Sequence, residues 1–365
     1  MNKSKNSKRV ILAVPNLSKG SGLSRYVLTV TEILINNGFQ VAVLTTHENQ
    51  NDDFGKAELK KINPDILYKP FFSNESKIIR YFKTLRFIRS YKPDILINNY
   101  NGLIQQLLPF ISAHTKVFHV IHNDAPDFYR MASLNGSNVY GYIAPTNAIA
   151  ENFNTYSSGR YANRVKVISH GVRDSGSEIA DRNHNKPLSL LFVGVLSTHK
   201  GPQFLYPITE ILKNKDINFS LTIIGDGVLA PEMKHQFDPE IKSGKVRMTG
   251  VIPHEDVYKE MSKADIFLYP TNCDAFGLVI AEAMMNGAVP VVGLIPGVTD
   301  NLVKEGFDGY LVKPTYVKGF ADRIEQLHND RELLSQLSLN SYDTAKNKLS
   351  ESIMTGNYLN IFNNL

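Results

Sequence analysis

Strand-like and helix-like stretches alternate along both halves of this 365-residue sequence, and this alternation constrains the fold more than any other feature. In the first half, a short apolar run at 9–16 is followed by a glycine-bearing loop, a helical pattern at 23–38 and a second apolar run at 39–46. The second half repeats this order at 189–196, 197–201, 202–215 and 219–227. Further strands are predicted at 94–99, 117–122, 141–146, 165–169, 246–250, 266–271 and 289–293. The pattern predicts an α/β fold with doubly wound, Rossmann-like layers and right-handed crossovers.

The length of the chain and one polar stretch near its middle predict two domains that face each other across a cleft. A chain of this size is long enough for two separate cores. The polar stretch at 173–187 is typical of a linker. We therefore expect an N-terminal domain over 1–170, a linker over 171–187 and a C-terminal domain over 188–345. Ligands of such folds bind beyond the carboxyl ends of the strands.

Cysteine and hydropathy indicate the compartment. The single cysteine, Cys273, cannot form an internal disulfide, which suits a reducing environment. The apolar run that follows the basic start is too short for the core of a signal peptide, and no run reaches the roughly 18–20 apolar residues of a membrane-spanning helix. The expected location is cytoplasmic.

The formal net charge of +5 is concentrated in one segment, 77–92. Six cations recur there at every third position, and apolar residues recur at helical spacing: Ile78, Phe82, Leu85 and Ile88. The sequence has no zinc-finger spacing, RNP-like motif or convincing helix-turn-helix, so nucleic acid is not the expected partner. An anionic membrane surface is the preferred partner, and a solvated helix packed on the sheet is the alternative.

The stretch "DAFGLVIAEAMMNGAVPVV" at 274–292 places an acid, Glu282, inside a nearly all-apolar helix. A buried carboxylate is costly unless it is paired. Glu282 therefore either faces water on a surface helix or binds a ligand, and Asp274 supplies a second acid eight residues earlier.

This stretch resembles the E-x7-E signature of the retaining glycosyltransferases of family 4, which have the GT-B fold. The matching residues are Phe276, Gly277, Leu278, Glu282, Ala283, Met284, Gly287, Pro290 and Val291. The resemblance implies that the backbone of Gly277, Leu278 and Val279 receives a diphosphate at a helix N-terminus. It also implies that Glu282 accepts hydrogen bonds from ribose hydroxyls. The first acid of the signature faces the donor sugar, and here Asp274 is one methylene shorter than the usual glutamate.

The loop "GVLSTHKG" resembles the family's phosphate-binding loop, G-R-x-x-x-x-K-G. Gly194, Lys200 and Gly201 match this pattern, but Val195 replaces the arginine. Valine cannot supply the two parallel hydrogen bonds of a guanidinium. Arg173 and Arg25 are the candidates for a compensating cation. Outside the family context, Lys200 would be an ordinary solvated lysine.

Three further elements follow the family pattern. Gly22, near Gly20, allows close approach of the backbone to phosphate or acceptor, although a plain turn explains a lone glycine loop as well. His122 at a predicted strand end matches the histidine near the donor sugar, with a structural role as the alternative. Gly250 and Val251 match the segment that contacts the base. The resemblance thus makes His122, Lys200 and Asp274 the candidate catalytic residues and places Phe276 in the donor site.

The resulting hypothesis is a retaining hexosyltransferase-type enzyme that takes a UDP- or GDP-sugar and glycosylates a cell-envelope glycan or lipid-linked acceptor. No cofactor or metal is expected, because the sequence has no D-x-D motif and no His/Cys/carboxylate cluster at ligand spacing. By family analogy, the last segment, 346–365, is expected to form a helix that crosses back and packs on the N-terminal domain. A non-catalytic GT-B subunit that binds glycan or a partner enzyme is the main alternative, and a sugar-nucleotide epimerase is a weaker one.

Overall fold

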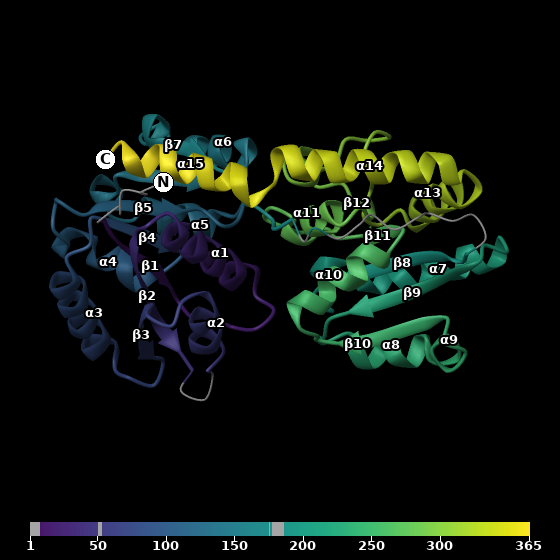
Figure 1. Ribbon diagram of the computed structural model, residues 1–365, viewed down its shortest axis with the longest axis horizontal. Helices are drawn as coiled ribbons and strands as arrows, with labels where there is room; N and C mark the ends of the chain where they lie inside the picture. Colours follow the sequence, from purple (N-terminus) through teal and green to yellow (C-terminus); the bar gives the residue numbers. More distant parts are fainter. Residues whose placement is uncertain (1–7, 50–52, 175, 177–185) are drawn as a thin grey trace. The chain divides into compact units, whose positions relative to one another are not determined.

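The computed structural model describes residues 8–49, 53–174, 176 and 186–365 (Figure 1). Most of the predicted linker, 171–187, lies outside the described residues. The chain divides into two compact units: the first comprises Met1–Ser169 and Tyr358–Leu365, and the second comprises His170–Asn357.

The first unit is built on a seven-stranded, all-parallel sheet in the order β3-β2-β1-β4-β5-β6-β7. Six of these strands had been predicted at nearly these positions, and β3 had not. The strands are β1 Arg9–Val14, β2 Gln40–Glu48, β3 Leu67–Phe72, β4 Ile95–Asn99, β5 Lys116–Val120, β6 Gly141–Ala144 and β7 Val165–Val167. The helices are α1 Gly22–Asn36, α2 Phe54–Ile62, α3 Lys77–Tyr91, α4 Gly102–Leu107, α5 Pro126–Ser133 and α6 Asn147–Tyr156.

The second unit has a six-stranded parallel sheet in the order β10-β9-β8-β11-β12-β13. Its strands are β8 Leu188–Val193, β9 Phe219–Ile224, β10 Val246–Gly250, β11 Ile266–Tyr269, β12 Val289–Gly293 and β13 Tyr310–Val312. Its helices are α7 Leu205–Asn214, α8 Ala230–Gln236, α9 Asp238–Lys242, α10 His254–Lys263, α11 Leu278–Met285, α12 Thr299–Leu302, α13 Val317–Asn329 and α14 Arg331–Lys348. The predicted fold class, two doubly wound α/β layers, is confirmed.

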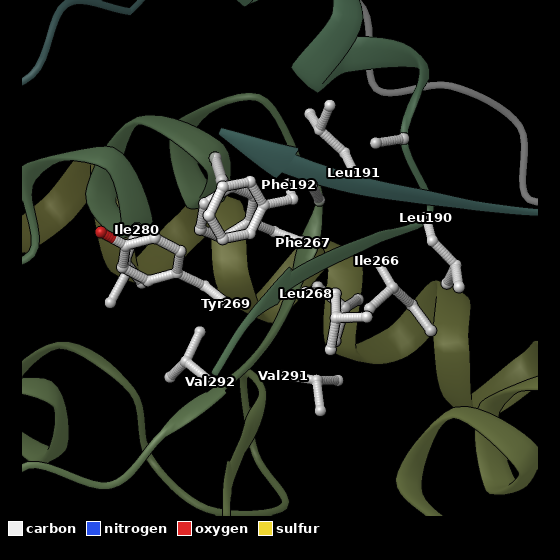
Figure 2. Packing of buried hydrophobic residues seen from close by; sticks show 14 of the residues in the cluster. Leu190, Leu191, Phe192, Ile266, Phe267, Leu268, Tyr269, Ile280, Val291 and Val292 are labelled. Atoms are coloured by element: carbon white, nitrogen blue, oxygen red, sulfur yellow. The ribbon is translucent and has the colours of Figure 1, made fainter. Parts of the chain in front are cut away.

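The central strands are buried on both faces, as expected for parallel sheets covered by helices on each side. In the second unit, Phe192 of β8 and Phe267 and Tyr269 of β11 gather beside Ile280 of α11 (Figure 2). The Phe192 and Tyr269 ring centroids are 5.6 Å apart. Ile280 belongs to the same buried cluster and packs α11, which carries Glu282, against the middle of the sheet.

Several predicted strands end earlier in the structure. The strands predicted to reach 122, 146 and 271 end at Val120, Ala144 and Tyr269. The chain leaves the sheet there and forms loops at the carboxyl edge. His122 therefore lies on a loop, where its side chain is available to a site.

The last helix, α15 (Glu351–Asn363), begins in the second unit, and its final turns belong to the first. Tyr358 and Phe362 are fully buried. The Phe362 ring lies 6.3 Å from that of Phe39 and 5.3 Å from that of Phe118, measured between centroids. The C-terminal segment thus completes the core of the first unit.

Helix α3 divides the apolar residues that share helical spacing in the sequence between its buried and exposed faces. Arg80, Thr84 and Ile88 form its buried face, whereas Ile78 and Phe82 are 70% and 72% exposed. Arg80 turns inward because its guanidinium donates to the backbone oxygen of Thr46 at 2.8 Å. Arg80 therefore does not belong to the solvent-facing basic flank. No helix within the described ranges is long and apolar enough to cross a membrane.

Candidate functional site

The candidate site of the second unit lies where the loops leave the carboxyl ends of β8, β10 and β11. Glycines allow these loops to pack backbone against backbone. A Cβ on Gly225 (φ +134°) would overlap the carbonyl oxygen of Gly194, and one on Gly201 (φ +77°) would overlap that of Pro270. These positions need glycine because no side chain fits.

Lys200 is held in place by the loop that follows β11. The backbone oxygen of His199 accepts hydrogen bonds from the backbone N–H of Asn272 at 3.1 Å and from the Thr271 hydroxyl at 3.1 Å. These bonds fix the turn at Thr198–Lys200. The Lys200 ammonium then lies 2.7 Å from Asp274 Oδ2 and donates to the Cys273 carbonyl at 3.2 Å. The structure thus brings two of the predicted catalytic residues together.

Asp274 accepts four hydrogen bonds. Oδ2 receives Lys200 at 2.7 Å and the Tyr269 hydroxyl at 3.2 Å, while Oδ1 receives the backbone N–H of Ala275 at 2.9 Å and of Gly277 at 3.0 Å. Burial raises the pKa of Tyr269 well above its usual range, and the nearby Asp274 carboxylate adds to this, so Tyr269 stays a donor. A carboxylate has about four lone-pair positions. A sugar hydroxyl would have to displace one of the present donors to reach Asp274.

The N-terminus of α11 offers two free backbone donors. Gly277 precedes the helix with φ +82°. Its N–H, predicted to receive a diphosphate, already donates to Asp274. The N–H groups of Leu278 and Val279 have no acceptor among the described residues. These two amides point along the helix axis toward its positive end, where an anion is stabilised.

Glu282, in the middle of α11, is 5% exposed and has neighbours that the sequence did not reveal. Its Oε1 lies 3.1 Å from His254 Nε2 and accepts the Tyr258 hydroxyl at 3.3 Å. The expectation that a ligand alone would partner this acid is therefore wrong, because α10 brings two polar groups to it. His254 and Tyr258 are four residues apart and therefore share one face of α10, the face that contacts Glu282.

The base-contacting segment lies at the end of β10. Gly250 has φ +68°, and its carbonyl accepts the N–H of Gly225 at 2.9 Å. Val251 is 49% exposed and Val195, after β8, is 51% exposed. The position of the missing arginine thus faces solvent at this edge of the sheet.

His170 is a site neighbour that the sequence reasoning missed. It is buried, and its ring centroid lies 4.8 Å from that of Phe276, just before α11. Burial lowers the pKa of His170 to about 3, so the ring is neutral at neutral pH. The exposed Arg173 follows Val172, which pairs with the end of α14 through a 2.7 Å bond to the Leu349 carbonyl.

The remaining predicted residues belong to the first unit. His122 follows β5, and its Nε2 lies 3.1 Å from Asn99 Oδ1 at the end of β4. The His122 ring meets the edge of Tyr26 at 4.9 Å between centroids, and the Tyr26 hydroxyl contacts that of Tyr358. Gly22 is the first residue of α1, with open space where a Cβ would lie. Arg25 is half-buried one turn further along the same helix.

Two family models match this chain in succession. The model described as "Glycosyltransferase Family 4" matches residues 20–175, and that described as "Glycosyl transferases group 1" matches residues 176–344. The chain belongs to the glycosyltransferases of family 4 and group 1 that these two models describe.

Similar proteins agree with the assignment to the glycosyltransferases. A 2-deoxystreptamine N-acetyl-D-glucosaminyltransferase of Niallia circulans is 26% identical over 174 residues, which cover 48% of this chain and 44% of that protein. An alpha-D-kanosaminyltransferase of Streptomyces kanamyceticus is 26% identical over 42% of this chain and 39% of that protein. The chain therefore spans less than half the length of these two relatives.

Two solved structures share the fold over nearly the whole chain. HepE of Anabaena in complex with UDP-glucose superposes with a TM-score of 0.79 at 16% identity, covering 98% of this chain and all of that one. TarM superposes with a TM-score of 0.80 at 12% identity over both full chains. Among the described residues, no group of three or more His, Cys, Asp or Glu gathers in a way that could hold a metal ion.

Proposed function

We propose that this glycosyltransferase is a retaining, metal-independent enzyme that transfers a sugar from a UDP- or GDP-sugar to a cell-envelope glycan or lipid-linked acceptor. The observation that carries the proposal is the grouping of Lys200, Asp274 and Glu282 around the free N-terminal amides of α11. Each of these groups suits one part of a nucleotide-sugar.

The diphosphate fits the two cationic features of the site. An ammonium has three N–H donors, and Lys200 spends two on Asp274 and Cys273. The third is left for a phosphate oxygen, alongside the amides of Leu278 and Val279. As the bond to the sugar breaks, charge accumulates on the departing diphosphate, and these fixed donors stabilise it.

The nucleoside fits the remaining groups. Glu282 lies about one turn into α11, where a buried carboxylate can accept hydrogen bonds from ribose hydroxyls. Gly250 and the exposed Val251 leave room for a base at the end of β10. A related structure holds UDP-glucose, which supports a UDP-sugar as donor. The resemblance to family 4 supports retention, with the acceptor attacking the face from which the diphosphate leaves.

A non-catalytic subunit is the second candidate, and two observations favour it. Val195 supplies no charge at the position of the family's arginine, and all four acceptor positions of Asp274 are filled. The test is mass-spectrometric detection of sugar release or transfer after incubation with UDP-, GDP- and ADP-sugars. Turnover of any donor excludes the second candidate. Nucleotide binding without turnover supports it.

Glu282→Ala is expected to weaken nucleotide binding. Losing hydrogen bonds to a charged acceptor costs about 1.5–3 kcal/mol, which raises Kd roughly 10- to 150-fold. Isothermal titration with UDP and GDP measures the change, and Glu255→Ala, which removes an exposed acid from α10, is the matched control. Binding equal to wild type would remove Glu282 from the donor site. Binding should also persist in EDTA, and its loss would contradict metal independence.

We further propose that α3 attaches the chain to an anionic membrane surface. Its solvent face presents Ile78, Ile79 and Phe82, which are 70%, 48% and 72% exposed. Exposed cations flank these apolar side chains at Lys77, Arg86 and Arg89. Apolar side chains bordered by cations are typical of helices that lie in a membrane interface.

Lys77→Gln, Arg86→Gln and Arg89→Gln together should release the chain from anionic vesicles. Each cation near such a surface contributes about 1 kcal/mol, so the triple change costs roughly 2–3 kcal/mol. Co-sedimentation with phosphatidylglycerol vesicles measures the effect, which high salt should mimic. Lys56→Gln with Lys60→Gln, two exposed lysines of α2, is the control. Equal retention by phosphatidylcholine vesicles would refute the electrostatic account.

A further inference from the structure

A basic pocket lies in the first unit, at the opposite edge of the sheet from the loop that carries His122. Its walls come from the end of α5 and the segments after α5 and α6, and it is an open depression of about 380 Å³. This volume is at the lower end of the range for small-ligand sites, about 300–1,000 Å³. The two segments lead into the starts of β6 and β7. The pocket therefore lies at the amino edge of the sheet, whereas His122 lies at the carboxyl edge.

Two guanidinium groups line the pocket, and no carboxylate does. They belong to Arg160 and Arg164. Arg164 donates one N–H to the Val139 carbonyl at 3.1 Å, which anchors it and leaves four. In the described part of the chain, the Arg160 side chain has neither an ion pair nor a hydrogen bond. Both arginines are exposed, and no acid in the lining balances their charge.

The remaining walls supply polar atoms and space. The Ser133 hydroxyl is buried and has no hydrogen-bond partner among the described residues. A buried hydroxyl without a partner destabilises the folded chain unless something else bonds to it. Asn135, in the left-handed region at φ +52°, is held by a 3.0 Å bond from its side chain to the Gln105 carbonyl. Gly136 has no side chain, and a Cβ there would overlap the Tyr161 hydroxyl.

We infer that this pocket binds a phosphate or diphosphate group. A guanidinium matches two phosphate oxygens with two parallel hydrogen bonds, so two arginines suit a dianion. The Ser133 hydroxyl can donate to a further oxygen. The ligand is either a soluble phosphorylated molecule or the headgroup of a phosphate-bearing lipid. This site is separate from the proposed donor site and does not depend on it.

The test is calorimetric titration of the full chain with inorganic pyrophosphate. Arg160→Gln with Arg164→Gln should raise Kd at least about tenfold, because two charge-assisted contacts are lost. The control is Arg130→Gln with Lys166→Gln, which removes the same charge outside the pocket and should leave Kd within about twofold at 0.15 M salt. An unchanged Kd in the first variant, or an equal loss in both, overturns the inference.

Two further variants sharpen the assignment. Ser133→Ala should weaken pyrophosphate binding without lowering the melting temperature, because the hydroxyl makes no hydrogen bond in the folded chain. Unchanged binding together with a lower melting temperature would count against the inference. Lys200→Gln separates this pocket from the donor site. If it abolishes all pyrophosphate binding, the pocket assignment is wrong and the proposed donor site gains support.

The source of the phosphate is found with vesicles of phosphatidic acid, in the background of the triple α3 variant. If the arginine changes remove vesicle binding as well as pyrophosphate binding, the ligand is a lipid headgroup. If they remove only pyrophosphate binding, the ligand is soluble. Either result supports the site, whereas vesicle and pyrophosphate binding that both survive the arginine changes refute it.

Discussion

Lys200→Ala should lower kcat about 10²–10³-fold, the usual loss when one preorganised donor to a developing negative charge is removed. The structure holds the Lys200 ammonium beside Asp274 at 2.7 Å, in a turn fixed by the loop after β11. The interaction with phosphate strengthens as the diphosphate departs, so the effect should be larger on kcat than on nucleotide affinity. Steady-state kinetics with the identified donor, combined with nucleotide titration, separates the two.

Lys234→Ala, at an exposed lysine of α8, is the control for loss of a positive charge from the second unit. It should leave kcat within about twofold, because exposed charges at a distance are screened by salt. Lys200→Arg keeps the charge but changes its geometry and should restore part of the rate. Weaker nucleotide binding with an unchanged kcat would mean that Lys200 contributes to ground-state binding alone.

Phe362→Ala should destabilise the first unit by about 3–5 kcal/mol, the usual cost of deleting a buried aromatic ring. The Phe362 ring is fully buried and packs against Phe39 and Phe118. Denaturant unfolding followed by circular dichroism measures the change. Two units need not unfold together, so the transition of the first unit must be resolved from that of the second.

Ile353→Ala is the matched control, because it truncates an apolar residue of the same helix that is 36% exposed. Its expected cost is below about 1 kcal/mol, as for most surface changes. Nucleotide affinity should not respond to Phe362→Ala, since the donor residues lie in the second unit. A cost for Phe362→Ala as small as that of the control would mean that the final turns of α15 do not belong to the core of the first unit.

The sequence predicts the sheets well because parallel strands covered on both faces are uninterrupted apolar runs. The two strands that were not predicted, β3 and β13, lack such an apolar run. In β3, only Phe71 is buried and a proline stands at position 70, as befits an edge strand. Strand β13 has three residues. The sequence of neither strand is apolar enough to be distinguished from that of a loop.

The sequence singles out Lys200 and Asp274, which the structure places in contact, but it shows few of the contacts that the candidate residues make. Resemblance to the family signature draws attention to Asp274 and Glu282, but nothing local indicates that α10 brings His254 and Tyr258 to Glu282. The buried position of Arg80 in α3 could not be predicted for a similar reason. Charge alone puts Arg80 in solvent, whereas the Thr46 carbonyl, 34 positions away in the sequence, draws it inside. A sequence pattern does not show which distant residue will be the partner of a buried polar side chain.

Main-chain contacts hold the start of the loop after β8 on both sides of Val195. Gly194 donates to the Ile224 carbonyl at 3.0 Å and Leu196 to that of Asp226 at 3.0 Å, while Gly225 presses on the Gly194 carbonyl. The side chain between them, Val195, takes no part in this packing and faces solvent. Evolution can therefore exchange the residue at this position without refolding the loop. Charge at this rim of the proposed phosphate site is a trait that such a scaffold can lose and regain by single substitutions.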